Sequence, residues 1–119
     1  MTRRHLEEGR GVSDTEQFRQ TLKAMDGVEL DAACRVVFRL LRRGKRYDKA
    51  IGRESLETHR LYTQCLDCFE ECRERDRPDI WENAKAAIYA EERADSENAK
   101  AARERMEREM RQGLPAAGG

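Results

Sequence analysis

Residues 29–44 have the sequence ELDAACRVVFRLLRRG, and this stretch decides the fold. Its apolar side chains recur at intervals of three and four residues, as they do on one face of an α-helix. They are Leu30, Ala33, Cys34, Val37, Phe38 and Leu41, with Val36 and Leu40 widening the face. Four arginines fall on the opposite face, namely Arg35, Arg39, Arg42 and Arg46. The pattern predicts a helix from about residue 29 to residue 43, ended by Gly44 and followed by a loop at 45–49.

Caps and apolar spacing predict three further helices around this one. A capping box that begins at Ser13 starts a first helix, which Gly27 ends. Ser55 can cap a third helix that runs to about Arg73. A fourth helix starts at residues 76–79, where Asp76 is the expected cap before a proline in the first turn.

The fold class predicted from these elements is all-α, a bundle of three or four helices with a charged helical C-terminal extension. We expect a flexible arm over residues 1–12, the bundle over 13–90, the extension over 91–112 and a flexible tail over 113–119. The predicted core contains Phe18, Leu22, Leu30, Val37, Phe38, Leu41, Leu61, Cys65, Cys68, Phe69, Cys72, Ile80, Trp81 and Ile88.

Charge and hydropathy exclude several classes of protein. The 119 residues carry 24 Lys plus Arg and 24 Asp plus Glu, so a globally basic nucleic-acid binder is not expected. No apolar run approaches the roughly 18 residues that a membrane span needs, which predicts a soluble protein. The N-terminal residues lack the apolar region of a secretory signal, so we expect an intracellular, reducing compartment.

The neutral total conceals a local basic surface. Residues 1–60 hold 14 basic and 10 acidic side chains. Arginine binds carboxylates and phosphates in a planar, bidentate manner. We therefore assign partner or anion binding to the basic cluster of Arg35, Arg39, Arg42, Arg43, Lys45 and Arg46. Two kinds of partner fit it: a protein with an acidic surface, or a nucleic acid whose phosphates the same face would neutralise.

Of the patterns in the chain, the four cysteines most resemble a metal-binding site. Cys65, Cys68 and Cys72 occupy positions i, i+3 and i+7 of one helix, and Cys34 lies on the core face of the preceding helix. Thiolates are ligands for Zn or Cu(I), and the spacing resembles one helix of the cysteine-rich bundles that store copper. The alternatives are four small core side chains, or a disulfide from Cys34 in an oxidising compartment.

The sequence does not suggest an enzyme. It has no glycine-rich phosphate loop and no HExxH pattern, and His5 and His59 are its only histidines. The abundant carboxylates pair with arginines at helical spacing. The favoured function is therefore a non-enzymatic interaction module, a small subunit or adaptor of a larger complex, with no cofactor required.

The C-terminal extension has only a thin apolar stripe. It consists of Ala99, Ala102, Met106 and Met110, among good helix formers. Such a helix is either a solvated extension or a surface for a partner helix, including a second copy of this chain.

Residues 36–90 resemble the small helical LYR-motif proteins. The resemblance lies in Val37-Phe38-Arg39-Leu40-Leu41-Arg42-Arg43-Gly44-Lys45-Arg46-Tyr47, and further on in Phe69-Glu70-Glu71-Cys72-Arg73 and Asp76-x-Pro78. It implies a mitochondrial accessory or assembly subunit in the matrix. Such a subunit binds an acyl carrier protein, whose lipid tail enters the helical core. The basic positions that would meet the acidic carrier are Arg39, Arg42, Arg43, Lys45 and Arg46.

Overall fold

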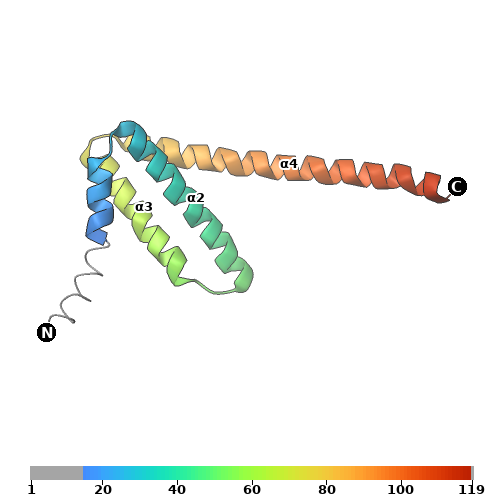
Figure 1. The fold of residues 1–119 in the computed structure, drawn as a ribbon, viewed down its shortest axis with the longest axis horizontal. Helices are drawn as coiled ribbons and strands as arrows, with labels where there is room; N and C mark the ends of the chain where they lie inside the picture. The colour runs from blue at the N-terminus through green and yellow to red at the C-terminus, as the bar shows by residue number, and fades with distance from the viewer. Residues whose placement is uncertain (1–14, 119) are drawn as a thin grey trace. The chain divides into compact units, whose positions relative to one another are not determined.

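The computed structural model describes residues 15–118, and the side chains of residues 15–113. Within this range there are four helices and no strand, which confirms the all-α prediction. They are a first helix covering residues 15–24, α2 (Gly27–Ile51), α3 (Leu56–Glu74) and α4 (Pro78–Gly118) (Figure 1). The chain divides into two compact units, one up to Ile88 and one from Tyr89.

The start of α2 is set by a capping box at Asp26. The backbone N–H of Glu29 donates to Asp26 Oδ1 at 2.8 Å, and the backbone N–H of Asp26 donates to Glu29 Oε1 at 2.9 Å. These two bonds satisfy amide groups that a helix start otherwise leaves unpaired. Gly27 is therefore the first residue of α2, and the prediction that it ends the first helix is wrong.

Gly44 lies inside α2, so the prediction of a helix end there and a loop at 45–49 is also wrong. A Cβ atom at Gly44 would lie 2.7 Å from Thr58 Oγ1 of α3. The missing side chain of Gly44 allows α2 and α3 to pack closely at this point. The sequence pattern alone does not distinguish such a glycine from one that ends a helix. The helix ends at Gly52, whose φ of 76° is the left-handed conformation that glycine adopts without strain.

Helices α2 and α3 pack side by side, joined by the short connection 52–55 (Figure 1). The carbonyl of Asp48 accepts the backbone N–H groups of Gly52 and Arg53, and its carboxylate accepts that of Ser55 at 3.0 Å. Ser55 in turn caps α3 by accepting the N–H of Thr58, as predicted. The polar side chain of Asp48 thus holds the connection in place while being 8% exposed.

The start of α4 agrees with the prediction at Pro78 but differs in its cap. Asp76, the expected cap, adopts a left-handed conformation with φ of 57° in the turn before the helix. Asp79 in the first turn accepts two bonds at 3.0 Å from the guanidinium of Arg77. The helix then passes Gly113 and runs to Gly118, so the prediction that the helical extension ends at residue 112 is wrong.

Some predictions fall outside the described residues. They are the arm over residues 1–12 and the capping box that begins at Ser13. The boundary between the two units follows Ile88, two residues before the predicted boundary at residue 90.

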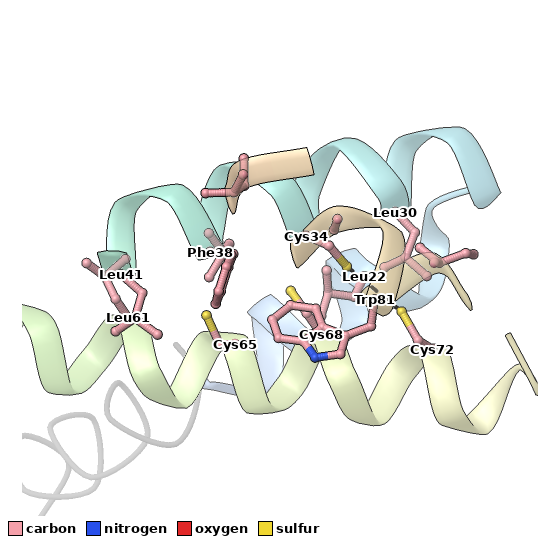
Figure 2. Close-up of a cluster of buried hydrophobic side chains, with 14 residues drawn as sticks. Leu22, Leu30, Cys34, Phe38, Leu41, Leu61, Cys65, Cys68, Cys72 and Trp81 are labelled. Atoms are coloured by element: carbon pink, nitrogen blue, oxygen red, sulfur yellow. Dashed lines mark hydrogen bonds between the residues drawn. The ribbon is translucent and has the colours of Figure 1, made fainter. Parts of the chain in front are cut away.

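The core lies between the helices of the first unit (Figure 2). Twelve of the fourteen predicted core residues are buried, and Cys34 and Ala84 are buried with them. Phe18 is partly buried against this cluster, whereas Phe69 is 36% exposed and was placed in the core wrongly. The rings of Phe38 and Trp81 meet edge to face, with centroids 5.7 Å apart, so the start of α4 is part of this core.

The first helix is held against α3 by one buried side chain and two arginines. Leu22 is fully buried. Arg19 Nε lies 3.1 Å from Asp67 Oδ1, a carboxylate that is only 5% exposed. At the other end, Arg75 donates to Glu71 Oε2 at 2.8 Å and to the carbonyl of Leu22 at 2.7 Å. That carbonyl belongs to the last turn of the helix and also accepts the backbone N–H of Met25 at 3.1 Å.

Candidate interaction surface

Because α2 is unbroken to Ile51, the predicted basic residues all lie on one helix. At 100° per residue, Arg35, Arg39, Arg42 and Arg46 fall within an arc of about 60°. We call these four residues the arginine stripe. It covers three turns of α2, one more than the helix predicted from the sequence would have carried.

The arginine stripe is less exposed than a solvated helix face. Arg35, Arg39 and Arg42 are half-buried, while Arg46 is exposed. Arg35 forms an ion pair with Asp31, one turn before it, at 3.1 Å. Arg39, Arg42 and Arg46 also interact within the chain. The stripe is therefore partly organised by the protein itself, which lowers the entropy lost when a partner binds.

The other two predicted basic residues point elsewhere. Arg43 lies about 70° around α2 from the middle of the stripe, and Lys45 about 90° around on the other side. Lys45 Nζ lies 6.0 Å from the ring centroid of Tyr62 on α3. Arg43 lines a hollow between α2 and α3. The structure therefore keeps four of the six predicted residues together and separates two.

An exposed apolar stripe runs along α2 beside the arginine stripe, and it was not predicted from the sequence. Its members are Val36, Leu40, Tyr47 and Ile51, with exposures between 41% and 63%. Their spacing of four, seven and four residues places them within an arc of about 60°. The spacing of these four residues is visible in the sequence. The predicted helix end at Gly44, however, separated Val36 and Leu40 from Tyr47 and Ile51, so the four were not recognised as one stripe.

Two shallow apolar hollows of about 440 Å³ each lie along this stripe. The first is between the first helix and α2, with Phe18, Met25 and Val36 in its walls. The second is between the C-terminal half of α2 and the start of α3, with Leu40, Tyr47 and Leu61 in its walls. Apolar hollows beside a basic surface are typical of protein interfaces, where an apolar centre is surrounded by charge.

Two acidic side chains of α3 pair with arginines inside the first unit. Asp67 and Glu71 are buried by the first helix and paired with Arg19 and Arg75. A hollow of about 150 Å³ lies at this contact between the first helix and α3. Asp67 and Glu71 thus belong to an internal ionic contact, while Glu70 and Glu74 of the same helix are exposed.

The four predicted thiols are brought together in the core (Figure 2). Cys34 of α2 faces Cys72 of α3 with their Sγ atoms 3.9 Å apart, and all four cysteines are unbridged. Among the described side chains, no group of three or more Cys, His, Asp or Glu residues is placed to hold a metal ion. The described donor set therefore does not fit the Zn or Cu(I) site that the spacing suggested.

The surroundings of Cys34, Cys65 and Cys72 keep these three thiols protonated. Burial raises the pKa of Cys65 and of Cys72 to about 12. The adjacent thiol of Cys68, and then burial, raise the pKa of Cys34. A neutral thiol is a weak nucleophile and a weak metal ligand. This arrangement favours the interpretation of the cysteines as small core side chains.

The second unit, taken by itself, is a charged helix whose described side chains are nearly all exposed. Met106 and Met110 are 60% and 61% exposed. No helix in residues 15–118 is long and apolar enough to cross a membrane.

No protein-family model, curated protein or solved structure matches this chain. The resemblance to LYR-motif proteins stays a prediction.

Proposed function

We propose that this protein is a helical interaction module, a small non-enzymatic subunit or adaptor, that binds a protein with an acidic surface through α2. The observation that carries the proposal is the continuity of α2 through Gly44. It aligns the arginine stripe with an exposed apolar stripe on the same helix. Apolar area supplies affinity and complementary charge supplies orientation in such interfaces.

The LYR resemblance suggests a more specific partner. The acidic partner would then be an acyl carrier protein, met in the mitochondrial matrix by Arg39, Arg42, Arg43, Lys45 and Arg46. The exposed Arg43, Lys45 and Arg46 support this form, since they are accessible to a large partner.

A binding assay with three probes tests the proposal. The full chain is titrated with an acylated acyl carrier protein, with a single-stranded RNA and with a DNA duplex, each over a range of salt concentration. We expect saturable binding of the acidic protein, weakened at least about tenfold in the combined variant Arg39→Glu, Arg42→Glu and Arg46→Glu. Circular dichroism shows whether that variant is folded, and Arg46→Glu alone, at an exposed position, serves where it is not.

Nucleic-acid binding is the outcome that would replace this proposal. The logarithm of the binding constant of a nucleic acid held by the arginine stripe falls linearly with the logarithm of the salt concentration. The slope is about 0.7 per phosphate contact for a single strand and about 0.9 for duplex DNA. Tight binding of RNA or DNA with that slope, and none of the acidic protein, would overturn the protein-partner proposal. If the acidic protein binds and the charge reversals have no effect, the arginine stripe is not the contact.

A further inference from the structure

The first helix is joined to α2 by a hinge of two residues, Met25 and Asp26. Asp26 has φ of −76°, which already suits a helix, and an extended ψ of −179°. A change of ψ at Asp26, together with Met25, would therefore join the first helix and α2 end to end. Residues 15–51 contain no proline that would break such a helix, since the prolines of the chain are Pro78 and Pro115.

The apolar side chains on the two sides of the hinge are in register for one continuous helix. At 100° per residue through the hinge, Phe18, Leu22 and Met25 would share an arc of about 80° with the apolar stripe of α2. The opened helix would thus be amphipathic along its whole length, as a helix that packs against another chain needs to be.

The contacts that hold the first helix do not depend on which copy of the chain supplies it. Leu22 is fully buried, and Arg19 Nε lies 3.1 Å from Asp67 Oδ1 of α3. Arg75, at the end of α3, donates to the carbonyl of Leu22 at 2.7 Å. We call these contacts the docking contact. The first helix of a second copy could form all of them on the same α3, which is the basis of dimers that exchange an element.

A capping box favours the closed hinge in the wild type. Asp26 Oδ1 accepts the backbone N–H of Glu29 at 2.8 Å, and Gly27 is the first residue of α2. In the opened helix this bond would be lost, and Gly27 would lie in a helix interior, where glycine is unfavourable. Exchange is therefore expected mainly when the chain folds at high concentration, since the docking contact of a second copy is then available.

We propose that two copies of this protein exchange their first helices, so that residues 15–24 of each copy dock on the α3 of the other. The opened hinge at Met25 and Asp26 connects the exchanged helix to its own α2. The occupant of each docking site is the same segment as in the single chain, so the dimer is built from contacts that the structure already contains. This self-assembly is separate from partner binding by the arginine stripe.

Two substitutions at the hinge should change the amount of dimer in opposite directions. Asp26→Ala removes the cap and should raise the association constant at least about tenfold. Gly27→Pro should abolish the dimer, because proline suits the first position of α2 after an extended residue but breaks a helix that continues through it. Both are made in the Met106→Glu and Met110→Glu background, so that the C-terminal helix does not contribute. The variants are refolded from urea at about 0.01 to 1 mM and measured by size-exclusion chromatography, with circular dichroism as the check on folding.

A pair of charge variants identifies the exchange itself. Arg19→Glu brings two carboxylates together within one chain, and Asp67→Lys brings two cations together, with a hollow of about 150 Å³ beside the lysine. Only exchange between the two variants restores an ion pair at both docking sites. Native mass spectrometry of the refolded equimolar mixture should therefore show the mixed dimer at least about tenfold above the dimer of either variant alone. The control carries both substitutions in one chain, which restores the pair without exchange.

Each of three results would overturn the inference. The first is a dimer that forms equally in the Asp26→Ala and Gly27→Pro variants, because such a dimer does not need the opened hinge. The second is an Asp26→Ala variant that stays monomeric at every concentration. The third is a folded control with no excess of the mixed dimer in the equimolar mixture, since residues 15–24 are then not exchanged. The proposed function stands or falls separately, on the binding of an acidic protein.

Discussion

Gly44 of α2 and Thr58 of α3 approach so closely that a Cβ atom on the glycine would lie 2.7 Å from Thr58 Oγ1. Thr58 is buried, and its hydroxyl lies 2.9 Å from Ser55 Oγ, so it has little room to move. Gly44→Ala should therefore destabilise the fold by about 1–3 kcal/mol through overpacking, despite the higher helix propensity of alanine. Urea unfolding followed by circular dichroism measures this free energy.

Two controls isolate the contact as the cause. Gly27→Ala, where an added Cβ meets nothing within 4 Å, should leave the free energy of unfolding unchanged or slightly raised. In a Thr58→Ala background, Gly44→Ala should cost less than about 1 kcal/mol, because the clashing oxygen is gone. An undiminished cost in that background would show that helix packing at this point does not depend on Thr58.

Arg75 is expected to be the most sensitive charged residue of the bundle. It joins the buried carboxylate of Glu71 to the carbonyl of Leu22, and so links α3 to the end of the first helix. Arg75→Ala should cost about 1.5–3 kcal/mol, since it leaves the buried carboxylate of Glu71 unpaired and removes the bond to the carbonyl of Leu22. Hydrogen exchange should show the first helix losing protection before α2 does.

The matched control for Arg75 is Arg73, two residues earlier in the last turn of α3. Its ion pair with Glu70 is long, at 3.8 Å, and its side chain is 71% exposed. Arg73→Ala should change stability by less than about 0.5 kcal/mol. Equal effects of the two substitutions would contradict the linking role of Arg75.

Asp48 should make the stability of the fold depend on pH. The backbone N–H of Ser55 holds the pKa of this carboxyl below its usual value. A lowered pKa means that the ionised form stabilises the fold above about pH 4, where the unfolded residue is also ionised. The stabilisation is lost as the pH falls from there through the lowered pKa.

The variant Asp48→Asn tests this pH dependence. It should be less stable than the wild type at neutral pH, and the difference should shrink as the pH falls below about 4. Urea unfolding at a series of pH values measures it, with the exposed Glu54→Gln as the control. A difference that stays constant with pH would mean that the substitution disturbs packing or geometry and does not remove a charge-dependent bond.

The sequence predicted the helices and most of the core because both follow from local periodicity. The predictions failed at glycines and at charged residues that were expected to be exposed. At these positions the structure is determined by a contact with a residue that is distant in sequence. From the sequence alone, Gly44 resembles a helix stop, and the structure shows instead that it packs against Thr58. Asp67 likewise resembles a solvated carboxylate, whereas in the structure it pairs with Arg19. The same error hid the candidate site, since Leu40 and Tyr47 belong to one stripe only when α2 continues through Gly44.

The cysteines should behave as core side chains toward alkylating reagents. Burial raises the pKa of Cys65 and Cys72 to about 12, so little thiolate exists at neutral pH. Iodoacetamide should label none of the four in the native protein and all four in denaturant, as counted by intact mass. Elemental analysis of protein purified without chelators should find no stoichiometric Zn or Cu. Bound metal, or rapid labelling of the native protein, would contradict the core interpretation.

The C-terminal helix is expected to self-associate weakly through its apolar stripe. Ala99, Ala102, Met106 and Met110 lie along one side of it and are exposed. Pairing two such helices would remove this area from water, but the stripe is thin, so the dimer should form only at high concentration. Sedimentation velocity over a wide concentration range should show the weight-average mass rising. The combined variant Met106→Glu and Met110→Glu should abolish that rise.

The control for charge alone is the combined variant Ala101→Glu and Gln112→Glu. These exposed positions lie about 140° and 120° around the helix from the middle of the stripe and receive the same two charges. This variant should associate as the wild type does. If both variants lose association, repulsion between the added charges explains the result without a methionine contact. If the wild type stays monomeric at every concentration, the helix is a solvated extension.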